Sequence, residues 1–294
     1  MAAIYNSIGT VFYLLLILHL GACQEDFCYA EAECGPQTWG GLCSRGTQQS
    51  PVALAYNFVD FLNGEERELL QSGAYLEQQS FFIENNGNTV SIRLRLDLTS
   101  TTYLSGSLLG GSYVFSQLHF HWGSDDQQGS EHIFDGIRKP MEAHFVHYAN
   151  RYPGISEALT SNTPGAVTVF AVIFDISDSD NPALNPIIRE LRKLHNANPE
   201  VRIQSRGLVL TDLLCPNTLR EVEVIQYDGS LTTPDCAEVV LWNLMIPTIP
   251  ISQNQLNEFR RLRNRRGRPL SNNFRPLQNL NGRVLRYFRT SIPR

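Results

Sequence analysis

Most of the chain consists of short segments in which apolar and polar residues alternate, separated by clusters of Gly, Asn and Pro. Residues 89–96 alternate with a period of two, which predicts a strand that buries one face. Residues 165–176 form an apolar run rich in Val, Phe and Ile, which is typical of a strand buried on both faces. A chain built from such segments has to form a sheet, because alternation with a period of two cannot bury one side of a helix.

Helical periodicity is confined to two segments, residues 185–195 and 253–262. Asn-Pro pairs beginning at positions 181, 185 and 198 bracket the first segment, as expected because proline disfavours the helical conformation of the residue before it. After residue 28 the sequence has no internal repeat, no low-complexity linker and no sharp change in composition. We therefore predict a single mainly β (α+β) domain over residues 28–288, dominated by a sheet with peripheral helices.

Composition and charge exclude several classes of partner. Hydrophobic residues make up 42% and charged residues 18% of the 294 residues, which suits a protein with a sizeable core and argues against a disordered or coiled-coil chain. The formal net charge of -5 gives no broad attraction to phosphate backbones, so we expect no nucleic-acid partner. Residues 260–268 hold six arginines, a run more typical of a solvated surface paired with nearby carboxylates than of an anion site.

Residues 1–23 have the pattern of a secretory signal peptide. The segment 11–20 is almost wholly apolar, and small residues follow it before the chain turns polar. The apolar run is too short for a comfortable membrane span, so we expect cleavage near Ala22 or Cys23 rather than an uncleaved anchor. The sequence thus predicts a secreted, extracellular protein with no membrane span in the mature chain, no lipid-anchor tail at residues 287–294 and no N-linked sugar acceptor.

Six cysteines fit an oxidising compartment if they pair, and one of them lies in the predicted signal peptide. Cys28 and Cys34 are close in sequence, whereas Cys43 and Cys236 would have to be brought together by the fold. Cys215 is then the odd cysteine. It is either a small buried hydrophobic residue or one half of an intermolecular disulfide.

Two histidines, His119 and His121, stand two positions apart in a strand-like segment, so both imidazoles project from the same face. A second such segment carries His144 and His147, whose odd spacing allows only one of them to face the first pair. Three neutral imidazoles on one sheet face form a zinc site that leaves a fourth position open to water, the arrangement of catalytic rather than structural zinc. The sequence contains no His-Glu-x-x-His protease motif.

Several motifs resemble, in order and spacing, those of the α-class carbonic anhydrases: residues 117–123 (Gln-Leu-His-Phe-His-Trp-Gly), 130–132 (Ser-Glu-His), 142–147 (Glu-Ala-His-Phe-Val-His) and 227–234 (Tyr-Asp-Gly-Ser-Leu-Thr-Thr-Pro). The resemblance runs from about residue 28 to residue 287. The cysteine positions are similar to those of the secreted and membrane-associated branch of that family. There they imply two disulfides, Cys28–Cys34 and Cys43–Cys236.

The resemblance implies a large, mostly antiparallel twisted sheet with Zn²⁺ at the bottom of a conical cleft, held by His119, His121 and His144. It also implies a hydrogen-bond acceptor for each ligating imidazole: Gln117 for His119, Glu142 for His144 and the backbone carbonyl of Asn273 for His121. Such acceptors fix the tautomer of the ligand and raise its basicity. The remaining two matching histidines, His132 and His147, occupy positions that are structural in the family.

The implied activity is reversible hydration of CO2 to bicarbonate and a proton, because zinc lowers the pKa of bound water to about 7 and the resulting hydroxide attacks CO2. Thr232 would orient that hydroxide while donating to Glu131, and Thr233 would lie beside the product. CO2 has no charge and no hydrogen to donate, so its pocket should be apolar. Four residues match the positions that form it: Val146, Val169, Leu231 and Trp242. Ordinary core packing is the competing interpretation for the two valines and Leu231.

One position departs from the pattern of the fastest family members. They carry a histidine after the Asn-Asn-Gly stretch, and it moves the proton out to buffer, whereas here Asn85-Asn86-Gly87 is followed by Asn88. An amide does not titrate near neutral pH, so Asn88 cannot accept and hold that proton. We expect proton transfer to depend more on water chains and external buffer.

Three alternatives use the same fold or the same activated water. An acatalytic, carbonic-anhydrase-like binding protein would lack a zinc ligand, and all three candidate ligands are present. A secreted matrix or scaffold protein would carry an appended acidic or repetitive segment, which this sequence lacks. A zinc hydrolase of esters or peptides would need a general base and a substrate groove. Comparing the turnover of CO2 with that of an ester separates such a hydrolase from a carbonic anhydrase.

Overall fold

The computed structural model describes residues 27–55, 59–60, 65–95, 102–195, 201–215 and 221–291, with the backbone alone at 59, 60 and 247. The predicted signal peptide, residues 1–23, lies outside the described residues. No helix within these ranges is long and apolar enough to cross a membrane.

Strands account for most of the regular structure. They are β1 (Ala53–Leu54), β2 (Val59–Asp60), β3 (Glu66–Glu68), β4 (Leu70–Gln71), β5 (Gln79–Asn85), β6 (Val90–Leu94), β7 (Tyr103–Ser105), β8 (Tyr113–Trp122), β9 (Ile133–Phe134), β10 (Met141–Ala149), β11 (Val167–Ser177), β12 (Arg202–Leu208), β13 (Glu221–Gly229), β14 (Val240–Ser252) and β15 (Leu285–Ser291). The helices are α1 (Leu42–Arg45), α2 (Gly73–Leu76), α3 (Ile155–Thr160), α4 (Asn185–Leu194), α5 (Leu210–Leu214) and α6 (Gln253–Arg260), with short 3-10 helices η1 (Pro36–Thr38) and η3 (Pro182–Leu184).

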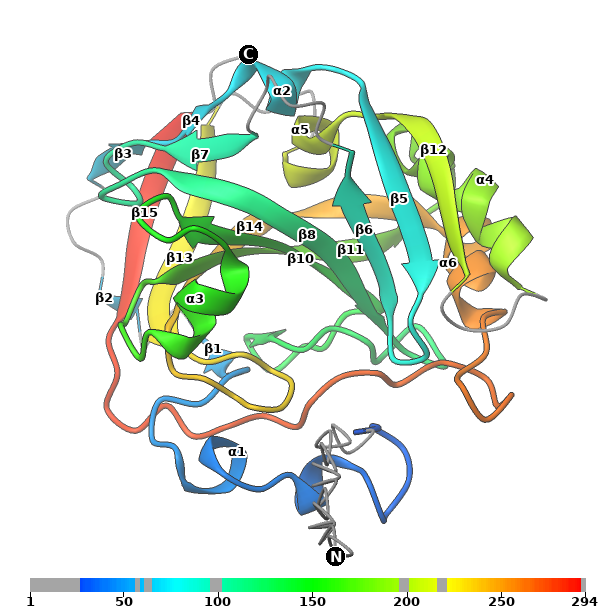
Figure 1. Ribbon diagram of the computed structural model, residues 1–294, viewed down its shortest axis with the longest axis horizontal. Helices are drawn as coiled ribbons and strands as arrows, with labels where there is room; N and C mark the ends of the chain where they lie inside the picture. The colour runs from blue at the N-terminus through cyan, green and yellow to red at the C-terminus, as the bar shows by residue number, and fades with distance from the viewer. Residues whose placement is uncertain are drawn as a thin grey trace, which may run out of the picture.

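The described strands build one large sheet of 13 strands and a small parallel pair, β1 with β9. The main path runs β12-β5-β6-β8-β10-β11-β14-β13-β15-β2, and β3, β4 and β7 pair at its margins. Neighbouring strands of this sheet are antiparallel, except that β11 is parallel to β14 and β15 is parallel to β2 and β3. Figure 1 shows a strongly twisted sheet with β8, β10, β11 and β14 crossing its middle and α4 and α6 beside β12. The predicted mainly β domain with a mostly antiparallel sheet is confirmed.

The elements singled out from periodicity are present. The alternating segment 89–96 contains β6, and the apolar run 165–176 is β11, whose first eight residues are all buried. The two helical patterns are α4 and α6. The side chain of Ser252 caps the first turn of α6, because it accepts from the backbone N–H of Gln255 and the Gln255 side chain bonds back to Ser252.

The two faces of the central strands pack into different cores. Along β10, Ala143 and Phe145 belong to the larger cluster, together with Leu118 and Phe120 of β8. Val146 of β10 points the opposite way, into a smaller cluster. The histidine-bearing face of β8 and β10 is therefore the face opposite the main core, as the alternation of a strand requires.

Two disulfides tie the N-terminal segment to itself and to the rest of the domain. Cys28–Cys34 closes a short loop, and Cys43–Cys236 joins α1 to the loop between β13 and β14 across 193 residues of sequence. In the chain-entropy account, closing so long a loop contributes roughly 5 kcal/mol to stability. Cys215 is in neither bridge and is buried in the larger core, which favours its role as a small hydrophobic residue over an intermolecular disulfide.

Candidate metal centre

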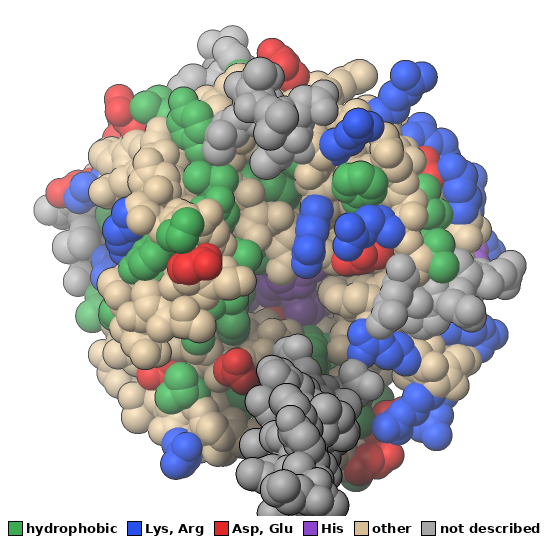
Figure 2. Space-filling model, viewed as in Figure 1, with side chains coloured by type: hydrophobic (Ala, Val, Ile, Leu, Met, Phe, Trp, Pro, Cys, Tyr) green, Lys and Arg blue, Asp and Glu red, His purple; other side chains and the backbone are tan. Residues whose placement is uncertain are grey.

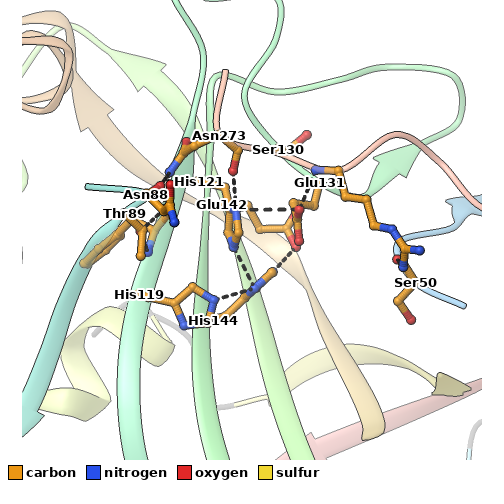
Figure 3. Close-up of polar contacts among 12 residues, drawn as sticks. Ser50, Asn88, Thr89, His119, His121, Ser130, Glu131, Glu142, His144 and Asn273 are labelled. Atoms are coloured by element: carbon orange, nitrogen blue, oxygen red, sulfur yellow. Dashed lines mark hydrogen bonds and ion pairs between the residues drawn. The ribbon is translucent and has the colours of Figure 1, made fainter. Parts of the chain in front are cut away.

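The register of two adjacent strands brings three histidines together. In the antiparallel pair of β8 and β10, His144 lies directly opposite His119, and Glu142 lies directly opposite His121. Residues opposite each other, and those two positions along on the same face, are close enough for their side chains to meet. Figure 3 shows the imidazoles of His119, His121 and His144 pointing toward one another.

One nitrogen of each ring faces a common point. His121 Nε2 lies 3.1 Å from His144 Nδ1, and the latter atom lies 3.3 Å from His119 Nε2. Nitrogens bound to a tetrahedral zinc ion at about 2.0–2.1 Å are about 3.3–3.4 Å apart. The spacing of these atoms therefore matches three ligands of one tetrahedral zinc.

Two of the rings have a fixed tautomer. His121 Nδ1 donates to the backbone carbonyl of Asn273 at 2.6 Å, and His144 Nε2 donates to Glu142 Oε1 at 2.6 Å, because a carbonyl and a carboxylate can only accept. The facing nitrogens, His121 Nε2 and His144 Nδ1, therefore carry lone pairs. Two lone pairs at 3.1 Å repel each other, and a cation between them removes that repulsion.

Burial keeps the rings of His119 and His121 neutral. It lowers the pKa of His119 well below its ordinary value, with help from the neighbouring His144 and His121, and it also lowers the pKa of His121. A neutral imidazole presents a lone pair, so neither ring has to lose a proton at neutral pH before it binds a metal. Burial alone would raise the pKa of Glu142. Electrostatic attraction to the imidazole groups of His132 and His144, together with the hydrogen bonds they donate, outweighs burial, and the pKa of Glu142 lies well below the usual range.

The residues thus fit a zinc ion on three independent grounds: donor type, spacing and protonation. All three ligand atoms lie within 4.8 Å of one another, and His121 and His144 are buried. Imidazole nitrogen is a preferred ligand of zinc, and three protein ligands leave one coordination position for a small molecule.

The prediction that Gln117 accepts a hydrogen bond from His119 is wrong. Gln117 Oε1 accepts from the hydroxyl of Ser91 at 3.0 Å, and His119 Nδ1 is buried with no hydrogen-bond partner in the described part of the chain. The cause is the neighbouring strand: β6 pairs with β8 so that Ser91 lies opposite His119 and competes for Gln117. The predicted partners of the other two rings, Glu142 and the Asn273 carbonyl, lie where we expected them.

The two remaining histidines of these motifs lie outside the ligand cluster. His147 lies on the opposite face of β10, where its Nε2 contacts the Tyr75 hydroxyl, and burial lowers its pKa to about 3. His132 hydrogen-bonds Glu142 Oε1 through Nδ1 at 2.7 Å, and its Nε2 lies 2.7 Å from the Tyr227 hydroxyl. His132 and His147 therefore support neighbouring groups.

His119 and His121 line a hollow that opens to solvent. Figure 2 shows histidine side chains at the bottom of that hollow. The cavity measures about 330 Å³. Its lining combines polar and aromatic side chains with a single arginine: Phe27, Tyr29, Asn86, Asn88, Thr89, Gln117, His119, His121, Thr233, Pro234 and Arg265. The predicted shuttle position, Asn88, and the predicted product neighbour, Thr233, are both in this lining.

The four predicted CO2-pocket residues gather beside the metal cluster. Val146, Val169 and Trp242 lie opposite one another on β10, β11 and β14, in the row next to that of His144. All three are buried in the smaller core, and Leu231 packs against it partly buried. The Trp242 ring centroid lies 4.8 Å from that of His144, so this apolar row borders the cluster.

The loop that carries Thr232 is held from both sides. Its neighbour Leu231 donates to the Ala237 carbonyl, and Cys236 donates to the Thr233 carbonyl. Thr232 and Glu131 are both buried, but the hydrogen bond expected between them is not made. Glu131 Oε1 instead accepts from the backbone N–H of Arg275 at 2.7 Å, and Oε2 has no partner among the described residues.

A family comparison agrees with this geometry. The family model for eukaryotic-type carbonic anhydrases matches residues 34–289. The chain belongs to the carbonic anhydrase family. It is 35% identical over 280 residues to "Carbonic anhydrase 6" of Bos taurus, covering 92% of this chain and 83% of that protein. It is also 33% identical over 286 residues to "Carbonic anhydrase 15" of Mus musculus, covering 92% and 87%, and 31% identical over 284 residues to "Carbonic anhydrase 6" of Homo sapiens, covering 94% and 88%.

Three side chains that line the cavity of this carbonic anhydrase were not predicted from the sequence: Phe27, Tyr29 and Arg265. Arg265 lies in the arginine run that we interpreted as a solvated surface. Four other arginines of the run pair with carboxylates, as that interpretation requires: Arg260, Arg261, Arg266 and Arg268. No pattern within the run distinguishes Arg265 from its neighbours.

Replacing His119, His121 or His144 by Ala should each remove most of the bound zinc, because each substitution deletes one of three converging nitrogens. His147→Ala is the matched control, since it removes a buried histidine from the same strand but from the opposite face. It should lower thermal stability and leave zinc content near one per chain. Metal analysis of the folded variants measures this. Loss of zinc in folded His147→Ala, with zinc retained in His144→Ala, would show that the wrong face of β10 was assigned.

Proposed function

We propose that the protein catalyses the zinc-dependent, reversible hydration of CO2 to bicarbonate and a proton. The observation that carries the proposal is the convergence of three imidazole nitrogens at the spacing of a tetrahedral zinc site. When bound there, zinc would supply a hydroxide nucleophile at neutral pH. Membership of the carbonic anhydrase family supports the same reaction.

Thr232 and Glu131 would orient the nucleophile. A threonine hydroxyl has one proton, so if it donates to a carboxylate its oxygen is left to accept from the attacking group. The free Oε2 of buried Glu131 is the atom suited to receive that proton. The described geometry does not contain this hydrogen bond, so the proposal requires the Thr232 hydroxyl to reach Glu131 when the nucleophile is bound. Thr233 lies in the cavity lining, where it would contact the departing bicarbonate.

CO2 would bind on the apolar row beside the imidazoles. Val146, Val169 and Trp242 present hydrocarbon and ring surface next to His144, with Leu231 at the edge. An apolar surface suits an uncharged molecule that donates no hydrogen bonds, because it excludes water from the carbon to be attacked. These side chains also pack the core, so their two roles coincide.

No observation of the described residues favours one of the alternative functions over CO2 hydration. An acatalytic binding protein would not need three unprotonated nitrogens directed at one point. A hydrolase of esters shares the nucleophile, and slow ester turnover is compatible with our proposal. We propose that the protein works in an extracellular, oxidising compartment, since two disulfides close within the described residues.

The test is stopped-flow CO2 hydration by the purified mature protein, with and without a zinc chelator. We expect activity that disappears with the chelator and returns when zinc is added back. Ester hydrolysis measured on the same samples should be far slower. A folded, zinc-loaded protein with no CO2 hydration would contradict the proposal and leave the binding-protein alternative.

With Asn88 at the shuttle position, we expect proton transfer to limit kcat. It lines the cavity between the imidazoles and solvent, and its amide cannot hold a proton at neutral pH. We expect kcat to rise with imidazole concentration, and Asn88→His to raise kcat in weak buffer because an imidazole there titrates near neutral pH. Stopped-flow kcat over a buffer series measures both effects, with kcat/KM for CO2 hydration as the internal control. A wild-type kcat that is independent of buffer, with no gain in Asn88→His, would refute the prediction.

A further inference from the structure

The edge of the described main sheet that is formed by β12 carries many exposed cationic side chains. Figure 2 shows Lys and Arg side chains along the upper right of the molecule, where Figure 1 places β5, β12 and α4. Seven exposed cations make up this surface, which we call the basic face: Arg93 of β6, Arg202 and Arg206 of β12, Arg189, Arg192 and Lys193 of α4, and Arg261 directly after α6.

Strand register places three of these arginines on one surface of the sheet. β12 pairs with β5 and β5 pairs with β6, so that Gln204, Phe82 and Arg93 form one row across the three strands. Arg202 and Arg206 lie two positions before and after Gln204, on the same face because side chains alternate along a strand. The Arg202 guanidinium lies over the ring of Phe82, 5.7 Å from its centroid. At the usual rise and strand spacing, Arg202 and Arg206 are about 13 Å apart, and β6 lies about 10 Å from β12.

The cations of α4 continue this surface around the edge strand. Arg189 Nη2 donates to the carbonyl of Arg206 at 3.2 Å and to Ser205 Oγ at 2.8 Å, so its guanidinium borders β12. Arg192 and Lys193 follow three and four positions later, which places them on the same side of the helix as Arg189. The basic face therefore extends from β6 across β12 to α4.

The carboxylates that pair with these cations lie beneath them. Glu190, whose side chain is 2% exposed, pairs with two cations of α4. Glu258, 8% exposed, pairs with one cation of α4 and with Arg261. Glu84, 17% exposed, pairs with Arg202. The side chains of their five cationic partners are 51% to 65% exposed, so solvent meets the positive groups while the compensating charges lie below.

The basic face has more cations than these acids can neutralise. Arg93 and Arg206 are exposed and pair with no carboxylate in the part of the chain that the structure describes. Seven cations against three paired carboxylates leave a formal excess of four positive charges, on a chain whose net charge is -5. Exposed ion pairs contribute little to stability, so folding gives no reason for this excess. A concentrated positive field attracts polyanions.

The partner that suits this face is a flexible chain that carries closely spaced anionic groups. Guanidinium groups bind carboxylate and phosphate through two parallel hydrogen bonds, and a sulfate group presents a similar pair of oxygens. Since the arginines of the sheet lie about 10–13 Å apart, one such chain can contact several of them at once. The half-buried ring of Phe82 lies in the same row and offers an apolar surface to a sugar ring. Two disulfides fit an extracellular compartment, where such chains are sulfated polysaccharides rather than nucleic acid.

We propose that the basic face binds a sulfated polysaccharide of the heparin type. None of its seven cations lines the 330 Å³ cavity that holds His119 and His121. The inference goes beyond the proposed function and does not depend on CO2 hydration, so each can fail without the other.

The experiment measures the affinity of the purified mature protein for immobilised heparin by surface plasmon resonance. The double variant Arg93→Gln, Arg206→Gln removes the two cations that pair with no described carboxylate, so it leaves the five paired cations of the face with their partners. It should weaken binding about fivefold, and the double charge reversal Arg93→Glu, Arg206→Glu about twentyfold. Added inert salt should weaken binding of the wild type steeply, because the contacts are between exposed charges.

The double variant Arg45→Gln, Arg289→Gln is the matched control. Both arginines are exposed, one in α1 and the other in β15 near the opposite end of the strand order, and the change in net charge is the same. The control should keep wild-type affinity, and thermal unfolding should show that all variants are folded.

Three competing ligands test which polyanion the wild-type protein prefers: heparin stripped of its sulfate groups, duplex DNA, and vesicles that contain an anionic phospholipid. Each should bind more weakly than heparin. The inference would be overturned by a wild-type protein that does not bind heparin, by equal affinities of the wild type and Arg93→Gln, Arg206→Gln, or by an equal loss in the control. Preference for desulfated heparin, DNA or vesicles over heparin would overturn it as well.

Discussion

The antiparallel register of β8 and β10 is the constraint on which the site depends. It sets His144 opposite His119 and Glu142 opposite His121, so the ligands and one of their acceptors come from four positions of a single ladder. A shift of β10 by one residue against β8 would turn His144 toward the main core and away from His119 and His121, because side chains alternate between faces. The large apolar residues between the histidines, Phe120 and Phe145 among them, hold the register by burying the other face.

Around that ladder, buried hydrogen bonds fix the rings and connect them to the threonine loop. Glu142 accepts one hydrogen bond from Nε2 of His144 and two from His132. His132 in turn contacts the Tyr227 hydroxyl. Tyr227 donates to the Ser50 hydroxyl, which accepts from the backbone N–H of Ser230. Buried polar groups are costly unless satisfied, so this chain restricts the site to one arrangement. On the other side the Asn273 side chain donates to the Phe120 and Asn88 carbonyls and thereby aims its own carbonyl at His121.

Local patterns in the sequence were sufficient for the parts of the site that follow alternation. His119 and His121 share a face because they are two apart, and the odd spacing of His144 and His147 separates them. The features that local patterns could not predict depend on contacts between distant segments. The register of β8 with β10 skips Ser116, a bulge that turns Phe115 onto the core face beside His147. Gln117 is taken by Ser91 of β6, and Arg265 reaches the cavity through a bond between Asn85 and Arg263. No periodicity in one segment encodes such pairings.

We propose that three imidazole nitrogens hold one zinc ion and leave a fourth position for a small ligand. X-ray absorption at the zinc edge of the purified protein can test this coordination. We expect one zinc per chain, with three nitrogen scatterers from imidazole and one further light atom, all at about 2.0–2.1 Å. A sulfur scatterer at about 2.3 Å, or four imidazoles closing the coordination sphere, would contradict it.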